Sequence, residues 1–361
     1  MEARFLSQEQ IRSTQLIAKD KHCGHYLAGQ PQSQKEDCIQ TEGILEVFAT
    51  NHYRVAIVFT ALSVMLTACT EDRSGSIAPV ADREMTPTTG PASGALVVAG
   101  GNIKDAAIIE RFLELAGGPD VAIVVVPTAA EGDVYSLEWD YLDPFRDAGA
   151  TNLTVLHTRD PAEANTQAFV APLKNARGVW FVGGRQWRIA DSYLGTLTEK
   201  EFRAVLDRGG VIGGSSAGAT IQGSYLARGD TNANTIMMGD HEQGFAYIQN
   251  VAIDQHLLVR NRQFDLIEII QAHPELLGLG LDEDTAIVVR GNEFEVIGQG
   301  YVAIYDSSRI VGPGGQFYFL APGDLFNLKE RQPLRPDDDS EPFAVIKTGP
   351  WDDNGGDASI E

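Results

Sequence analysis

A serine at a tight, glycine-rich turn is the most reactive feature of the sequence. Residues 214–218 read Gly-Ser-Ser-Ala-Gly and fit G-x-S-x-G, a pattern typical of a strand-to-helix turn that presents a nucleophile. Side chains at Gly214 and Gly218 would collide with the neighbouring strand and helix. The pattern predicts Ser216 as the nucleophile, at a helix N-terminus whose free N–H groups can stabilise an oxyanion. A turn that only links strand to helix, or binds a phosphate, would have a similar composition.

A serine hydroxyl needs a base within hydrogen-bond reach and usually a third group that orients this base. The best candidate base is His256, because it closes an apolar run over 251–256 that turns polar at its C-terminal end, where α/β sheets place ligands. The three carboxylates over 282–284 lie between apolar segments and are candidates for the orienting acid. The alternatives are a structural histidine and an acidic, solvated turn.

The cysteines and histidines form no metal-binding pattern. Cys23, Cys38 and Cys69 belong to no CxxC pair and do not lie at zinc spacing from histidines. Any metal site would have to consist of carboxylates and histidines. The sequence therefore predicts neither a metal nor another cofactor.

The charge of the chain limits its partners. Lys and Arg number 28 against 50 Asp and Glu, which gives a net charge of -22. Because a phosphate backbone needs a basic patch, we expect no nucleic-acid binding. A neutral or cationic substrate suits such a surface better.

The elements that must position these residues follow an alternating pattern. Apolar runs at 95–99, 121–126, 153–156 and 179–182 alternate with helical spacing over 103–115 and 137–148. Short strands that are apolar on both faces indicate a parallel sheet covered by helices on two sides. After Asp284, the runs 286–289, 293–297, 301–305 and 317–320 predict antiparallel strands at one edge. The fold class is therefore α/β.

The segment over 51–68 resembles a bacterial lipoprotein signal peptide. Arg54 provides a positive flank, the run from Val55 to Leu66 is apolar or small, and small residues precede Cys69. A run of twelve residues is short for a transmembrane helix, which needs about 20. A transmembrane helix and a buried core helix are therefore the weaker alternatives for this segment. The resemblance implies that Cys69 is lipidated and anchors the protein to a membrane of the cell envelope, facing the periplasm or the exterior.

These patterns divide the chain into five segments. We expect an overextended N-terminus over 1–50, the signal peptide over 51–68, and a flexible tether rich in Pro, Thr and Ser over 69–94. A catalytic α/β domain follows over 95–328, and a loosely ordered tail over 329–361. The length of 361 residues also suits two ordinary domains.

Four separated motifs between Leu96 and Leu320 resemble the cyanophycinase family, serine peptidases related to bacterial aspartyl dipeptidases. They read Phe-Val-Gly-Gly-Arg-Gln at 181–186, Gly-Gly-Ser-Ser-Ala-Gly-Ala at 213–219, Asp-Gln-His at 254–256 and Gly-Leu-Asp-Glu-Asp-Thr-Ala at 280–286. The resemblance implies a three-layer, flavodoxin-like fold akin to the class I glutamine amidotransferases. It also implies hydrolysis of cyanophycin, a poly-aspartate backbone that bears arginine on each β-carboxyl, to β-Asp-Arg dipeptides.

The resemblance assigns expected roles to individual residues. It implies Ser216 as nucleophile, His256 as general base and Glu283 as orienting acid. We expect the N–H groups of Ala217 and Gly184 to bind the oxyanion. The resemblance further implies a substrate pocket made of five residues: Gln186, Asp254, Gln255, Arg260 and Arg262.

Two positions depart from the family pattern and concern the substrate. Arg185 stands where the family usually has aspartate, and Asp265 stands where the intracellular enzymes carry an arginine. An acid at 265 would remove a contact to a substrate carboxylate and add a repulsion. Arg185 or Arg188 could supply the missing positive charge.

Two other functions are left open by the sequence. An α/β-hydrolase esterase has the order serine, acid, histidine, which would require His273 as base with Asp240, Asp254 or Asp265 as acid. A catalytically silent binding lipoprotein could retain the pocket, and labelling with a fluorophosphonate would distinguish it from an enzyme. The sequence also leaves a homodimer open.

Overall fold

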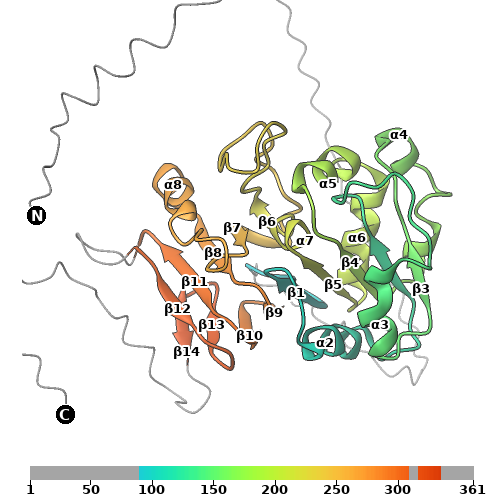
Figure 1. Cartoon of the computed structure of the whole chain (residues 1–361), viewed down its shortest axis with the longest axis horizontal. Coiled ribbons are helices and arrows are strands. Elements are labelled where there is room, and N and C mark those ends of the chain that lie inside the picture. The colour runs from blue at the N-terminus through green and yellow to red at the C-terminus, as the bar shows by residue number, and fades with distance from the viewer. Residues whose placement is uncertain (1–88, 309–315, 335–361) are drawn as a thin grey trace, which may run out of the picture. The chain divides into compact units, whose positions relative to one another are not determined.

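The computed structural model describes residues 89–308 and 316–334, and its central element is a nine-stranded sheet (Figure 1). The strands of this sheet are β1 (Ala95–Ala99), β2 (Ile123–Val126), β3 (Leu153–Val155), β4 (Gly178–Phe181), β5 (Val211–Ser215), β9 (Thr285–Arg290), β10 (Glu293–Gly298), β13 (Leu325–Asn327) and β14 (Gln332–Leu334). Their order is β14-β13-β10-β9-β1-β5-β4-β2-β3, and the five strands from β1 to β3 are parallel. The other four pair antiparallel with their neighbours.

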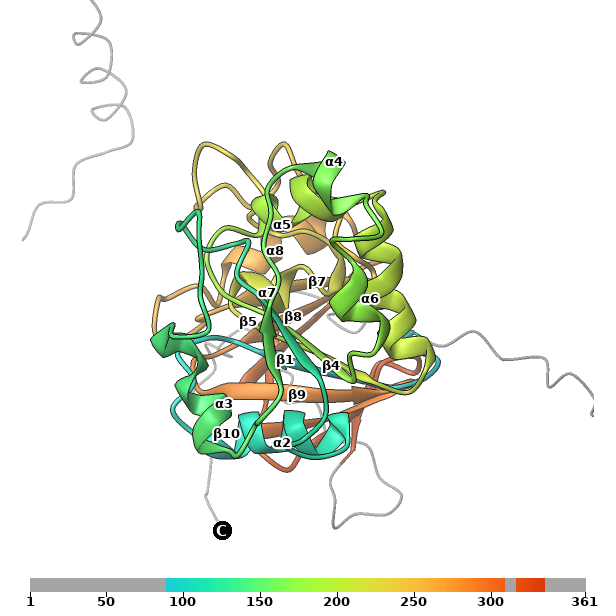
Figure 2. The ribbon, with the colours of Figure 1, turned by 90° about the vertical axis from the view of Figure 1, so that its right-hand side faces the viewer.

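Helices cover both faces of this sheet, as Figure 2 shows. The helices are α2 (Ala106–Ala116) and α3 (Asp143–Asp147) on one face, and α5 (Gln186–Tyr193), α6 (Leu197–Asp207) and α7 (Ala217–Thr220) on the other. On the first face, the rings of Phe112, Phe145 and Trp180 pack edge to face. Three layers result, and the predicted α/β class is confirmed.

A second sheet was not predicted. It contains β6 (Gly223–Tyr225), β7 (Ile248–Gln255), β8 (Leu277–Leu281), β11 (Val302–Asp306) and β12 (Tyr318–Leu320) in the order β12-β11-β8-β7-β6. The predicted antiparallel strands therefore divide between two sheets, because β9 and β10 extend the first and β11 and β12 extend the second. An apolar run identifies a strand but not the strand with which it pairs.

The remaining helices are short segments around the sheets. They are α4 (Pro161–Ala164) and α8 (Asp265–Ala272), with the 3-10 turns η1 (Asp140–Leu142) and η2 (Ala171–Lys174). The predicted helix over 137–148 is thus shorter than expected and is divided between η1 and α3. Pro144 in the first turn of α3 lacks the N–H that would continue a helix from η1.

The ordered domain is wider than the predicted 95–328. Thr89 donates its N–H to the side chain of Asn292 and accepts a hydrogen bond from the N–H of Gln249, so the end of the predicted tether packs on the domain. At the other end β14 pairs with β13, and the tail predicted from 329 is wrong for these residues. Pro333 signalled a tail, but an edge strand tolerates its missing N–H.

The predicted N-terminus over 1–50, the signal peptide and Cys69 lie outside the described residues and stay predictions. Within residues 89–308 and 316–334, no helix is long and apolar enough to cross a membrane.

Parallel strands of both sheets bring five loops to one place. Gly100 follows β1, Gly183 follows β4 and Ser216 follows β5 in the first sheet, whereas His256 follows β7 and Glu283 follows β8 in the second. Ligands of α/β proteins bind at these carboxyl ends. The fold therefore gathers the sequence-predicted catalytic residues from two sheets.

The turn after β5 depends on two close backbone approaches. A Cβ atom at Gly214 would lie 2.2 Å from the carbonyl oxygen of Gly218, and one at Gly218 would lie 2.1 Å from the carbonyl oxygen of Phe181. Both neighbours are backbone atoms, which cannot rotate away. The predicted need for glycine at these positions is confirmed.

We expect Gly218→Ala to lower the free energy of unfolding by at least about 2 kcal/mol, because the added methyl group must displace β4 or α7. Urea unfolding measures this loss. Gly195→Ala is the control, since Gly195 has a φ of +74° but open space around it, and we expect it to cost only about 1 kcal/mol of backbone strain. Equal losses would contradict the steric explanation.

Candidate active site

Ser216, His256 and Glu283 form a continuous hydrogen-bonded chain. The Oγ of Ser216 lies 2.9 Å from Nε2 of His256, and Nδ1 of His256 lies 2.6 Å from Oε1 of Glu283. With the proton of the neutral imidazole on Nδ1, the ring donates to the carboxylate and Nε2 accepts from the serine hydroxyl. This is the arrangement in which an imidazole can take the proton of a nucleophilic serine.

The backbone of Ser216 has the strained conformation of a tight turn. Its φ is +57° and its ψ is -115°, between the last residue of β5 and the first residue of α7. Ser215, the preceding residue, points to the other face of the sheet, where its side chain contacts Tyr141. The structure thus pairs Ser216, not Ser215, with the imidazole.

The loop after β1 packs against the imidazole of His256. His256 has a φ of +56° and donates its N–H to the carbonyl oxygen of Gly100. A Cβ atom at Gly101 would lie 2.3 Å from Cε1 of His256, so any side chain there would displace the ring. In the sequence these two glycines stand directly after the apolar run over 95–99 and belong to none of the four motifs.

Asn102 is a site residue that sequence reasoning missed. Its Nδ2 donates to Oε2 of Glu283 at 2.6 Å. It belongs to none of the four motifs, and its only signal in the sequence is its place after a predicted parallel strand.

The surroundings keep His256 neutral and Glu283 ionised. Burial lowers the pKa of His256 below its ordinary 6.5, and the positive charges of Arg260 and Arg262 add to this, although the hydrogen bond to Glu283 opposes it. Burial tends to raise the pKa of Glu283, but hydrogen bonds from Asn102 and His256 outweigh this effect, so the pKa lies below its ordinary value. At neutral pH the imidazole is therefore free to accept a proton.

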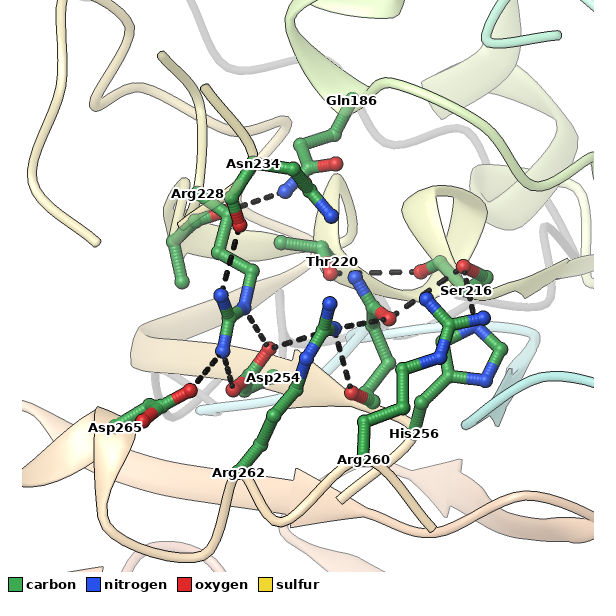
Figure 3. A network of polar contacts seen from close by, with 12 residues as sticks. Gln186, Ser216, Thr220, Arg228, Asn234, Asp254, His256, Arg260, Arg262 and Asp265 are labelled. Atoms are coloured by element: carbon green, nitrogen blue, oxygen red, sulfur yellow. Dashed lines mark hydrogen bonds and ion pairs between the residues drawn. The ribbon is translucent and has the colours of Figure 1, made fainter. Parts of the chain in front are cut away.

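A buried ion cluster lies beside the catalytic residues (Figure 3). Arg228 donates from Nε and Nη2 to the two carboxylate oxygens of Asp254 at 2.8 and 3.1 Å, and its Nη2 also contacts Asp265. Arg228 and Asp254 are both buried. Arg228 was not predicted, because it stands in no motif. Asp254, which was predicted to bind substrate, is already paired within the chain.

The other predicted pocket residues take different positions around this cluster (Figure 3). Arg262 donates to the backbone and side-chain oxygens of Gln255, whose Oε1 lies 3.5 Å from Oγ of Ser216. Arg260 is half exposed, with its Nε 4.0 Å from Oε1 of Glu283. Gln186 is buried and donates to the backbone of Ala227, but its Oε1 has no hydrogen-bond partner among the described residues.

The predicted oxyanion donors flank the nucleophile. Ala217 is the first residue of α7, directly after Ser216. Gly184 has a φ of +140°, and a Cβ atom at the neighbouring Gly183 would lie 3.1 Å from Cβ of Ser216. The glycine loop after β4 therefore runs beside the serine.

Arg185 and Arg188, the candidates for a replacement positive charge toward the substrate, both hydrogen-bond to backbone carbonyl oxygens. Arg185 donates to the carbonyl oxygen of Asp230, and Arg188 donates to those of Ala129 and Ala130. The cation that reaches Asp265 is Arg228 instead.

The esterase arrangement is not the one found. His273 ends α8, where its Nδ1 lies 3.6 Å from Glu275, and the base that contacts Ser216 is His256. Within the described ranges, no group of three or more His, Cys, Asp or Glu residues could hold a metal ion.

Comparison with known proteins identifies the family of this chain. The model of peptidase family S51 matches residues 95–297. Cyanophycinase from Geminocystis herdmanii is 30% identical over 245 residues, which cover 63% of this chain and 90% of that protein. Cyanophycinase from Synechococcus elongatus is 31% identical over 243 residues, which cover 62% of this chain and 75% of that protein.

A solved structure shows a similar fold. The crystal structure of a peptidase from an acI-B1 Actinobacterium superposes with a TM-score of 0.50 at 22% identity and covers 65% of this chain and 97% of that one. The resemblance found in the sequence is confirmed: this chain belongs to peptidase family S51, together with the cyanophycinases, and is a serine-type peptidase.

Proposed function

We propose that the protein hydrolyses cyanophycin, or a related β-aspartyl peptide, through an acyl-enzyme formed on Ser216. The observation that carries this proposal is the chain of short contacts from Ser216 through His256 to Glu283. The cyanophycinases that resemble this chain support the substrate class.

In the proposed reaction, Oγ of Ser216 attacks the scissile carbonyl carbon while Nε2 of His256 takes the hydroxyl proton. The imidazolium is stabilised by the anionic Glu283. It then gives the proton to the leaving amine as the carbon–nitrogen bond breaks. The same Nε2 then takes a proton from a water molecule as the water oxygen attacks the ester carbon, and it gives this proton to Oγ of Ser216 as the ester bond breaks, which releases the acid and restores the serine.

The negative oxygen of each tetrahedral intermediate needs two donors. Ala217 is the first residue of α7, directly after Ser216, and Gly184 lies in the glycine loop beside it. Donors fixed in advance stabilise the developing charge without reorganising. We assign the oxyanion hole to the N–H groups of these two residues.

The ion cluster weakens the main objection to a substrate that carries carboxylates. Asp265 alone would repel them, but Arg228 binds both Asp265 and Asp254. Arg262 lies 3.9 Å from Asp254, and Arg260 is half exposed beside the catalytic residues. We propose that these two arginines bind substrate carboxylates, while the net charge of -22 attracts the cationic arginine side chains.

We expect Ser216→Ala to lower release of soluble dipeptide from insoluble cyanophycin by at least about a thousandfold, because the nucleophile of a coupled triad is lost. Ser215→Ala is the matched control and should keep activity within about tenfold of wild type. Turnover by Ser216→Ala within tenfold of wild type would place the nucleophile elsewhere. If fluorophosphonate labels Ser216 but cyanophycin stays intact, only the substrate assignment is wrong.

The pH dependence should reflect the lowered pKa of His256. The base acts only when neutral, so kcat/KM should rise with pH and level off, with an apparent pKa below 6.5. Arg260→Gln removes a nearby positive charge, so the pKa of His256 should rise and this limb should move to higher pH. A limb above pH 7 in the wild type would contradict the described environment.

We expect Arg262→Ala to raise KM for cyanophycin by about tenfold or more, because a charge-assisted hydrogen bond to a substrate carboxylate is lost. Arg290→Ala is the control, since Arg290 is an exposed arginine at the end of β9 farthest from the glycine loops. Steady-state kinetics on both variants make the comparison. Unchanged KM for Arg262→Ala would show that this arginine does not bind the polymer.

A further inference from the structure

We propose that Asn102 is a positioning residue for the catalytic groups: its side-chain amide holds the Glu283 carboxylate in the orientation that the imidazole requires. This inference rests on the proposed function and deepens it. Asn102 lies outside the motifs of the sequence and acts through Glu283, not on the substrate.

The two oxygens of Glu283 have separate partners. Oε2 accepts from Nδ2 of Asn102 at 2.6 Å, and Oε1 accepts from Nδ1 of His256 at 2.6 Å. Rotation of the carboxylate about its last bond would therefore break both hydrogen bonds. Two such bonds fix the plane of the group, whereas one bond would leave it free to turn.

Among the described residues, no other side chain is placed to take over this task. The nearest cation, Arg260, is half exposed and its Nε lies 4.0 Å from Oε1, beyond hydrogen-bond distance. It also approaches the oxygen that His256 already uses. Asn102 is the side chain that hydrogen-bonds the outer oxygen.

Asn102 is exposed and has a left-handed backbone conformation. Its φ is +43°, in the left-handed region that asparagine enters more easily than most residues. The preceding Gly101 packs against the imidazole of His256 and accepts the N–H of Asp284, the residue after Glu283. The loop after β1 thus contacts His256 through Gly101 and Glu283 through Asn102.

The chemical consequence concerns the imidazolium that forms during attack. Its Nδ1 proton must face a carboxylate oxygen, and a carboxylate that turns away stabilises the charge less. A donor on the outer oxygen favours the charged form of Glu283, in agreement with the direction of its pKa. Asn102 should therefore affect kcat more than KM.

The test measures the rate at which a fluorophosphonate labels Ser216 in the full chain, which requires no knowledge of the natural substrate. We expect Asn102→Gly to label about tenfold more slowly, because glycine keeps the positive φ and removes only the amide. Asn250→Gly is the matched control. Asn250 is exposed, has a φ of +55° and lies near the start of β7, away from His256, so its variant should label at the wild-type rate.

A pH series on Asn102→Asp separates positioning from a general structural role. At neutral pH two carboxylates would face each other, and labelling should be slower than in Asn102→Gly. At lower pH one carboxyl group takes up a proton and can donate to Glu283. The ratio of the Asp to the Gly rate should therefore rise as the pH falls, whereas a structural role would leave this ratio constant.

The outcomes distinguish this inference from the function on which it rests. Labelling of Asn102→Gly within about twofold of wild type, with Ser216→Ala unlabelled, would overturn the role of Asn102 and leave the nucleophile in place. Labelling of Ser216→Ala at the wild-type rate would instead overturn the proposed function. A pH-independent ratio between the Asp and Gly variants would also overturn the positioning role.

Discussion

Three consecutive backbone carbonyls at the end of β1 hold the catalytic groups together. The carbonyl oxygens of Ala99, Gly100 and Gly101 accept the N–H groups of Ser216, His256 and Asp284 at 3.0, 3.1 and 2.9 Å. These donors come from loops after β5, β7 and β8, which belong to two different sheets. Because successive carbonyls are spaced by the covalent chain, they fix the separation between Ser216, His256 and the residue directly after Glu283, the proposed orienting acid.

This arrangement requires unusual backbone conformations, which the buried strands must stabilise. Ser216, His256 and Asp284 all have positive φ values between +55° and +57°, and each such residue costs about 1 to 3 kcal/mol. The strands before them, β5, β7 and β8, end in fully buried residues. The strain therefore persists because packing of the strand ends leaves the loops no relaxed alternative.

Local sequence patterns could predict Ser216, because a nucleophile turn needs small neighbours, and His256, because a polar residue closed an apolar run. The role of Glu283 came only from the family resemblance, since three adjacent carboxylates are otherwise equivalent. Asn102 could not be predicted, because its partner is 181 residues away. The second sheet escaped prediction for the same reason: strand patterns are local, whereas strand pairing joins distant segments.

Arg228 shows why charge alone was a poor guide to the substrate. Considered alone, Asp265 would repel a substrate carboxylate and Asp254 would bind a cationic group of the substrate. In the structure both carboxylates bind one buried guanidinium, and removal of this guanidinium would leave the buried Asp254 carboxylate without its two closest hydrogen bonds. Asp254 and Gln255 are the last residues of β7 and His256 follows them, so the cluster also holds the strand end that precedes His256. In the proposed function, recognition of substrate charge is therefore assigned to the half-exposed Arg260 and to Arg262, whose contact with Gln255 links it to Ser216.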